Sequence, residues 1–196
     1  MVLDGRIPNA ATTANAETLA AISNTVKSSS NYEIAFYEAE CFLEVSKLID
    51  RRQIELSVPP TTMKNISKNT NLQFAKHVNH AYAFELYLKC LMIIENGTFY
   101  SGHDLLELFK KLNPSTQSSI VDYYKSNYRI ARRNMTYFGF FDEPDFFELL
   151  GEAKKAFMDF RYLFERNGTP PYELDGIVEC VRREIIRLKP ELATLW

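Results

Sequence analysis

Glycine is scarce in this chain: the 196 residues include only 7, about half the share that is usual in a globular protein. So few glycines leave few positions for tight turns, which favours long uninterrupted segments. No segment shows the sustained alternation of apolar and polar residues that is typical of a half-buried strand, and no repeat of fixed period is present. We therefore expect an all-α protein.

Cysteine is also sparse, and Cys41, Cys90 and Cys180 lie too far apart in the sequence to suggest a redox pair or a metal-ligand group. His77 and His80 are three residues apart, but no third ligand accompanies them. No glycine-rich phosphate loop is present either. We therefore predict no metal and no cofactor, and cysteines that are buried as small apolar residues in a reducing cytosol.

The chain has no large excess of charge of one sign and no long hydrophobic run. Lysine and arginine total 23 against 25 acidic residues, and this net charge of −2 excludes nucleic-acid binding through bulk positive charge. The most apolar stretch, 81–94, has 14 residues, whereas a bilayer span needs about 20. Residues 1–9 lack the apolar core of a signal peptide. We expect a cytoplasmic protein without a membrane partner.

Apolar residues recur at helical spacing through most of the chain, which predicts a compact bundle of four to five long helices with short accessory helices. On length grounds we expect one domain over 31–196, after a loosely ordered leader (1–30) with a short helix near 16–26. The expected helices run from residue 31 to a linker at 57–71, and then over about 72–95, 101–112, 114–131, 143–166 and 172–188.

Two of these helices have clear apolar faces, and a third has a predicted start. In the helix that begins at Asn31, the expected core-facing residues are Ile34, Tyr37, Cys41, Val45 and Leu48. In the helix expected after residue 142, the apolar stripe consists of Phe146, Leu149, Leu150, Ala153, Phe157, Phe160 and Phe164. For the short helix over 101–112, we expect Ser101 to be the N-cap and Asp104 to lie near the positive end of the helix dipole.

Glu85 lies on an apolar face of the most hydrophobic helix, so its carboxylate needs a partner, because burying it unpaired costs several kcal/mol. Lys89 is four residues later, in the favourable order for an ion pair on a helix. Arg161 lies beside the apolar stripe of a later helix. We predict a buried Glu85–Arg161 contact that joins the two helices as a structural ion pair, with an active-site acid as the alternative.

Three short segments together resemble the signatures of the HEPN-like (higher eukaryote and prokaryote nucleotide-binding) helical family. They are FELYLKCLM at 84–92, GHDLLELFKKL at 102–112 and AFMDFRYLFE at 156–165. The resemblance covers about residues 75–165. It implies a compact cytoplasmic bundle that forms a homodimer and acts in a bacterial defence, toxin–antitoxin or stress system, where a cognate protein partner is expected.

The polar residues of these motifs are expected to form one buried network. They are Glu85, Lys89, His103, Asp104 and Arg161. Ribonucleases of the family carry an arginine and then a histidine five to seven residues later, but after Arg133 those positions hold Phe138, Gly139 and Phe140. The resemblance therefore implies a non-catalytic or degenerate binding module. The alternatives are a metal-independent endoribonuclease with a rearranged site, which would need His103 close by, and a purely structural homodimer.

A basic and aromatic segment over 123–141 is the expected contact for single-stranded RNA or a nucleotide. It carries a local charge of +4, contains no acidic residue and has seven aromatic residues. The expected contacts are Lys125, Arg129, Arg132, Arg133 and Asn134. A solvated helix end is the alternative for the cations, and contact with the core or with a second subunit is the alternative for the aromatic rings.

Overall fold

The computed structural model describes residues 31–57, 63–133, 145–155 and 174–194, with only the backbone described for 57, 63–71, 128–133 and 175. Within these ranges the chain forms six α-helices, two short 3-10 helices and no strand, which confirms the all-α prediction. The helices are α2 (Asn31–Ser57), α3 (Met63–Asn96), α4 (Leu105–Lys110), α5 (Pro114–Arg133), α6 (Phe146–Glu152), η2 (Ala153–Lys155), α8 (Asp175–Leu188) and η4 (Pro190–Thr194).

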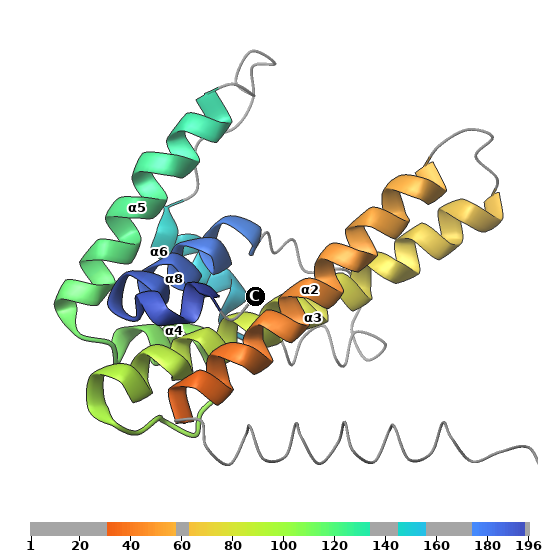
Figure 1. Ribbon diagram of the computed structural model, residues 1–196. Helices are drawn as coiled ribbons and strands as arrows, with labels where there is room; N and C mark the ends of the chain where they lie inside the picture. Colours follow the sequence, from red (N-terminus) through yellow and green to blue (C-terminus); the bar gives the residue numbers. More distant parts are fainter. Residues whose placement is uncertain (1–30, 58–62, 134–144, 156–173, 195–196) are drawn as a thin grey trace, which may run out of the picture.

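The two longest helices, α2 and α3, pack against each other as an antiparallel hairpin whose tip extends beyond the other helices (Figure 1). Helix α5 rises from the same base in a different direction, and α8 lies between α5 and the hairpin. The short helix α4 contacts both α3 and α6. Helix α3 therefore occupies the centre of the fold, since it contacts α2, α4 and α8.

The hydrophobic core is built around the middle of α3. From Ala81 to Met92 every side chain is buried except those of Tyr82 and Lys89, which confirms the predicted core helix. A second part of the core joins three short or peripheral elements through aromatic rings. The Phe146 ring of α6 lies 5.0 Å from the Phe109 ring of α4 and 5.3 Å from the Tyr124 ring of α5. Such tilted and edge-to-face pairs stabilise beyond the apolar area that they bury.

The predicted course of two helices, α3 and the helix expected over 143–166, was wrong. Helix α3 begins at Met63, inside the expected linker 57–71, because its first turns pack against α2 and tertiary contact overrides the weak helix propensity of Asn and Thr. The helix expected over 143–166 is not one uninterrupted α-helix, because α6 ends at Glu152 and tightens into the 3-10 helix η2. Its predicted end near residue 166 lies outside the described residues. The end of its apolar stripe (157–164) and the leader (1–30) lie outside the described residues.

The predicted core-facing side of α2 was also wrong. Tyr37, Val45 and Leu48 are 53%, 41% and 53% exposed, and the opposite side of the helix faces α3. The buried side consists of Phe36, Ala39, Glu40, Leu43 and Ser46. The apolar pattern was misleading because α2 is apolar on two opposite sides, and the inner side includes two polar residues that the structure satisfies with hydrogen bonds.

Glu40 is the centre of a buried hydrogen-bond network that connects three helices. Its carboxylate is 4% exposed and accepts from the Tyr87 hydroxyl of α3 at 2.5 Å. From α8, the Arg182 guanidinium donates through Nε at 2.5 Å and through Nη2 at 3.3 Å. Burial and then the Glu40 carboxylate raise the pKa of the Tyr87 hydroxyl, which therefore stays protonated as a donor. The sequence interpretation missed this network.

We predict that Glu40→Ala lowers the free energy of unfolding by about 3 kcal/mol, because the Arg182 and Tyr87 donors lose their buried acceptor. Urea denaturation followed by circular dichroism measures this change. Glu44→Ala is the matched control one turn further along α2, where the carboxylate is 40% exposed and pairs with Arg51 at 2.9 Å. The control should lose less than about 1 kcal/mol. Equal losses in the two variants would contradict the prediction.

Candidate functional site

The structure brings Glu85, Lys89 and His103 together where α3 meets the loop before α4. The Glu85 carboxylate is 1% exposed, and its Oε1 atom accepts from Lys89 Nζ at 2.7 Å. The same oxygen lies 2.8 Å from His103 Nδ1. The buried carboxylate thus has one partner from its own helix and a second from a residue 18 positions later in the chain.

The loop between α3 and α4 positions His103 through well-defined ends of both helices. Gly97 has a φ of +71° and donates its N–H to the Ile93 carbonyl at 2.9 Å, so α3 ends in the left-handed conformation that favours glycine. Asp104 is the N-cap of α4. Its carboxylate accepts from the Leu106 and Glu107 N–H groups at 3.1 Å each.

The predicted Ser101 cap was therefore wrong, because Asp104, three residues later, occupies the capping position and the helix begins at Leu105. Asp104 contributes to the site by fixing the backbone beside His103, since its own carboxylate oxygen is hydrogen-bonded to the first turn of α4. Within the described part of the chain its carboxylate bonds to the first turn of α4 and not to Glu85, so Asp104 lies next to the predicted polar network.

The second oxygen of Glu85, Oε2, is buried and has no hydrogen-bond partner among the residues that the structure describes. The expected partner, Arg161, lies outside those residues, so the Glu85–Arg161 contact stays a prediction. A buried carboxylate oxygen without a partner is costly, and a guanidinium is well suited to it because it can donate two hydrogen bonds in one plane.

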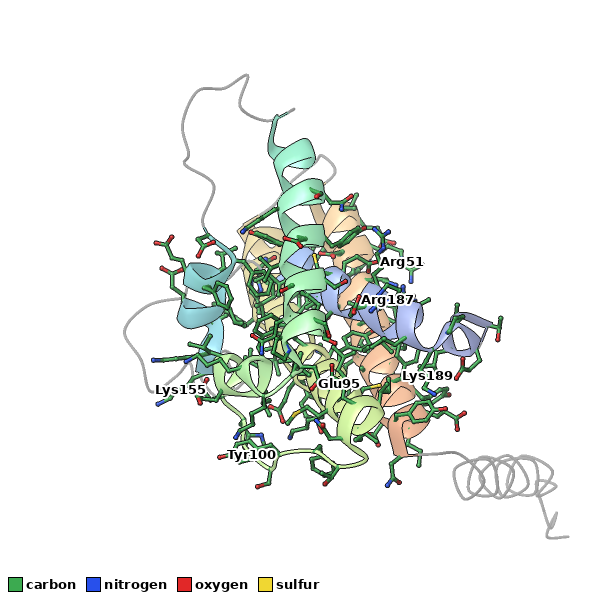
Figure 2. The ribbon with its side chains drawn as sticks, turned by 90° about the vertical axis from the view of Figure 1, so that its left-hand side faces the viewer. Arg51, Glu95, Tyr100, Lys155, Arg187 and Lys189 are labelled. Atoms are coloured by element: carbon green, nitrogen blue, oxygen red, sulfur yellow. The ribbon has the colours of Figure 1, made fainter. Side chains whose placement is uncertain are left out.

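Two exposed aromatic rings lie on the loop that carries His103, each with a lysine near it, and the sequence interpretation did not select them. Phe99 and Tyr100 are 54% and 46% exposed. Lys89 Nζ lies 5.8 Å from the Phe99 ring centroid, and Lys111 Nζ lies 4.3 Å from the Tyr100 ring centroid. Figure 2 shows Tyr100 at the lower edge of the molecule, on the loop that carries His103. Two adjacent aromatic residues, followed after one serine by a Gly-His-Asp sequence, are the signal that could have located this surface.

This arrangement allows His103 to act as a proton acceptor or donor. When Nδ1–H donates to Glu85, the imidazole tautomer is set and Nε2 is left to exchange a proton with a bound group. The His103 side chain is 58% exposed, so a ligand can reach it. The nearby rings and cations are the side-chain types that contact a base and a phosphate.

The basic segment predicted to bind nucleic acid lies on the last turns of α5. Helical spacing puts positions 125, 129 and 132 on one face of this helix, Lys125 is exposed, and Arg133 is its last residue. Asn134 lies outside the described residues. In both views this end of α5 is at the opposite end of the molecule from the loop that carries His103 (Figures 1 and 2). The chain therefore has two separate candidate surfaces.

Two tyrosines of the basic segment have partners within the protein. Tyr124 is 4% exposed and packs in the core. The Tyr123 ring is partly buried, and the Arg183 guanidinium of α8 lies 3.8 Å from its centroid. These two rings support the alternative in which the aromatic residues contact the core, and the case for nucleic-acid binding at α5 rests on its cations.

No three His, Cys, Asp or Glu side chains are grouped to hold a metal ion within the ranges that the structure describes. None of the helices in those ranges combines the length and the apolar character needed to cross a bilayer. Comparisons with protein-family models, with curated proteins and with solved structures find no match for this chain.

We predict that Lys89→Met lowers the free energy of unfolding by about 2 kcal/mol, because it removes the Lys89 ammonium from the buried Glu85 carboxylate. Methionine keeps the apolar stem of the lysine. The matched control is Lys110→Met, which removes an ion pair with Glu107 in which both side chains are more than half exposed. That change should stay within about 0.5 kcal/mol. Urea denaturation measures both, and a loss no larger than the control's would show that Glu85 does not need Lys89.

Proposed function

We propose that this chain is a HEPN-like helical module that binds single-stranded RNA through the last turns of α5. The observation that carries the proposal is the charge of this helix end: four cations and no acid between residues 123 and 133, in a chain of net charge −2. Cations on a helix face neutralise phosphates and release their counterions, which supplies sequence-independent affinity. The exposed Lys125 starts this surface, and α5 extends it away from the base of the fold.

The length of the basic surface favours an RNA strand over a single nucleotide. Positions 125 to 132 span about 10 Å along the helix axis, which is longer than one phosphate group. The three motifs shared with the HEPN-like family support the same assignment, because Glu85, Lys89 and His103 come from two of them and lie together. A nucleotide, or a cognate protein partner in a defence or stress system, is the alternative occupant.

We predict that Arg132→Glu combined with Arg133→Glu weakens RNA binding by at least about tenfold at low salt, since two phosphate contacts become repulsive. Fluorescence anisotropy with a labelled single-stranded RNA measures the affinity, and the salt dependence of binding should become shallower. Lys154→Glu combined with Lys155→Glu is the matched control, because it makes the same change of net charge at adjacent exposed residues of η2.

The control separates a local contact from the effect of net charge. The proposal expects the Lys154 and Lys155 variant to bind nearly as well as the wild type. RNA binding that is absent in the wild type, or that falls equally in both variants, would contradict a binding surface on α5.

A metal-independent ribonuclease with a rearranged site is the second candidate, and the Glu85–His103 pair favours it. In such a site, His103 Nε2 takes the proton of a ribose 2′-hydroxyl, and the 2′-oxygen then bonds to phosphorus. The 5′-oxygen leaves with a proton from water, giving a 2′,3′-cyclic phosphate and a 5′-hydroxyl. Glu85 stabilises the imidazolium, Lys89 is a nearby cation for the phosphate, and the Phe99 and Tyr100 rings can contact a base.

For this second candidate we predict that His103→Ala reduces cleavage at least about 100-fold, because the proton acceptor is lost. Cleavage of labelled single-stranded RNA in EDTA-containing buffer, resolved by gel electrophoresis, measures it. His77→Ala is the control: that histidine is partly buried on α3, away from Glu85, and its Nε2 atom contacts Gln73 at 3.0 Å. Wild-type protein that leaves the RNA intact, or a His103 variant as active as the control, would exclude the ribonuclease.

A further inference from the structure

Two parts of the fold extend as separate arms from a common base (Figure 1). One is helix α5, which carries the proposed RNA surface on its last turns. The other is the tip of the α2–α3 hairpin, here called the hairpin arm and defined as residues 44–57 and 63–80. The two arms point in different directions, so their ends are separate surfaces of the molecule.

The positive charge of the chain is concentrated on these two arms. Residues 44–80 contain six basic and three acidic residues, and residues 123–133 contain four basic residues and no acidic one. All other residues together contain 13 basic and 22 acidic residues. The chain therefore combines two positive arms with a strongly acidic remainder, and a polyanion is attracted to the arms and repelled elsewhere.

On the α2 side of the hairpin arm, the cations are exposed and outnumber the carboxylate that they contact. Lys47 and Arg51 share the carboxylate of Glu44, at 3.5 Å and 2.9 Å. The two cationic side chains are 55% and 62% exposed. Exposed ion pairs contribute little stability, and one carboxylate neutralises only one of the two cations. Lys47 and Arg51 can therefore turn towards a phosphate group at small cost.

The first half of α3 adds positive charge to the same arm. Residues 63–84 contain three lysines and no acidic residue. Lys76 pairs with Asp50 of α2 at 2.9 Å, so the excess charge comes from Lys64 and Lys68. Because these two positions are four residues apart, they share one face of the helix.

Helical spacing places this face on the side of α3 that is away from α2. Gln73 faces α2, because its Oε1 atom accepts from Gln53 Nε2 at 2.7 Å. Position 64 is nine residues before Gln73, which is about two and a half turns, so the two positions lie on opposite sides of α3. The basic positions of α3 are therefore on the outer surface of the hairpin arm.

We propose that the hairpin arm is a second contact for the RNA that α5 binds, so that one strand spans both arms. The inference rests on the proposed function, because α5 supplies the first contact. Helix α2 has 27 residues and α5 has 20, so they are about 40 and 30 Å long. A stacked strand of about 30 nucleotides, at roughly 3.4 Å per nucleotide, exceeds both lengths together and can reach from one arm to the other. Two linked contacts bind more tightly than either contact alone.

The length of the RNA separates the two contacts. A strand of about 8 nucleotides occupies one arm at a time, whereas a strand of about 30 occupies both. Lys47→Gln combined with Arg51→Gln should weaken binding of the long strand at least about fivefold, and should leave the short strand within about twofold because α5 holds it. Fluorescence anisotropy measures both affinities. The salt slope for the long strand should fall by about 1.4, or about 0.7 for each lost phosphate contact.

A second variant, on the other helix of the arm, keeps the test independent of any effect on the folding of α2. Lys64→Gln combined with Lys68→Gln should give the same selective loss for the long strand. The matched control is Lys154→Gln combined with Lys155→Gln, which removes the same charge from exposed residues outside both arms. The control should bind both strands like the wild type. Circular dichroism melting curves establish that each variant is folded.

The outcomes distinguish this inference from the proposed function. If Arg132→Glu with Arg133→Glu weakens both strands while the hairpin variants bind the long strand like the wild type, α5 binds RNA alone and the inference is wrong. It is also wrong if the hairpin variants weaken both strands equally, or if the control loses as much affinity. A wild type that binds neither strand contradicts the proposed function itself, and the inference with it.

Discussion

The Glu40 carboxylate is the interaction on which the arrangement of α2, α3 and α8 depends. It receives hydrogen bonds from Tyr87 and Arg182, so one buried charge holds a donor from each of two other helices. Apolar packing alone would allow helices to rotate or slide at modest cost, whereas a buried carboxylate is tolerated only where its donors meet it. The network therefore selects one alignment of the three helices, and the apolar core supplies most of the favourable free energy.

Much of the fold could be predicted from the sequence, because helical periodicity is a local property. The buried middle of α3 follows directly from the apolar stretch at 81–94. The buried side of α2 could not be predicted in this way. Periodicity finds an apolar row but does not say whether the protein's own core or something else covers it, and here the inner side includes Glu40 and Ser46.

In the candidate site too, contacts within one helix could be predicted from the sequence, and contacts between distant segments could not. The Glu85–Lys89 pair is four residues apart on one helix and is visible in the sequence. The approach of His103 to Glu85 was suggested only by the order of three motifs. The Glu40 network was missed because its partners are 47 and 142 residues away, and no local pattern connects them. The exposed Phe99 and Tyr100 rings follow from the loop conformation, which periodicity does not address.

Glu85 Oε1 contacts two side chains: that of Lys89, which is nearly buried, and that of His103, which is largely exposed. A molecule that drew the His103 ring away from this oxygen would leave a carboxylate inside the core with less compensation. The binding free energy of that molecule would then be partly offset by the cost of destabilising the middle of α3. Ligand binding at His103 and the stability of the core around α3 are thus thermodynamically linked, and each changes the free energy of the other by the same amount.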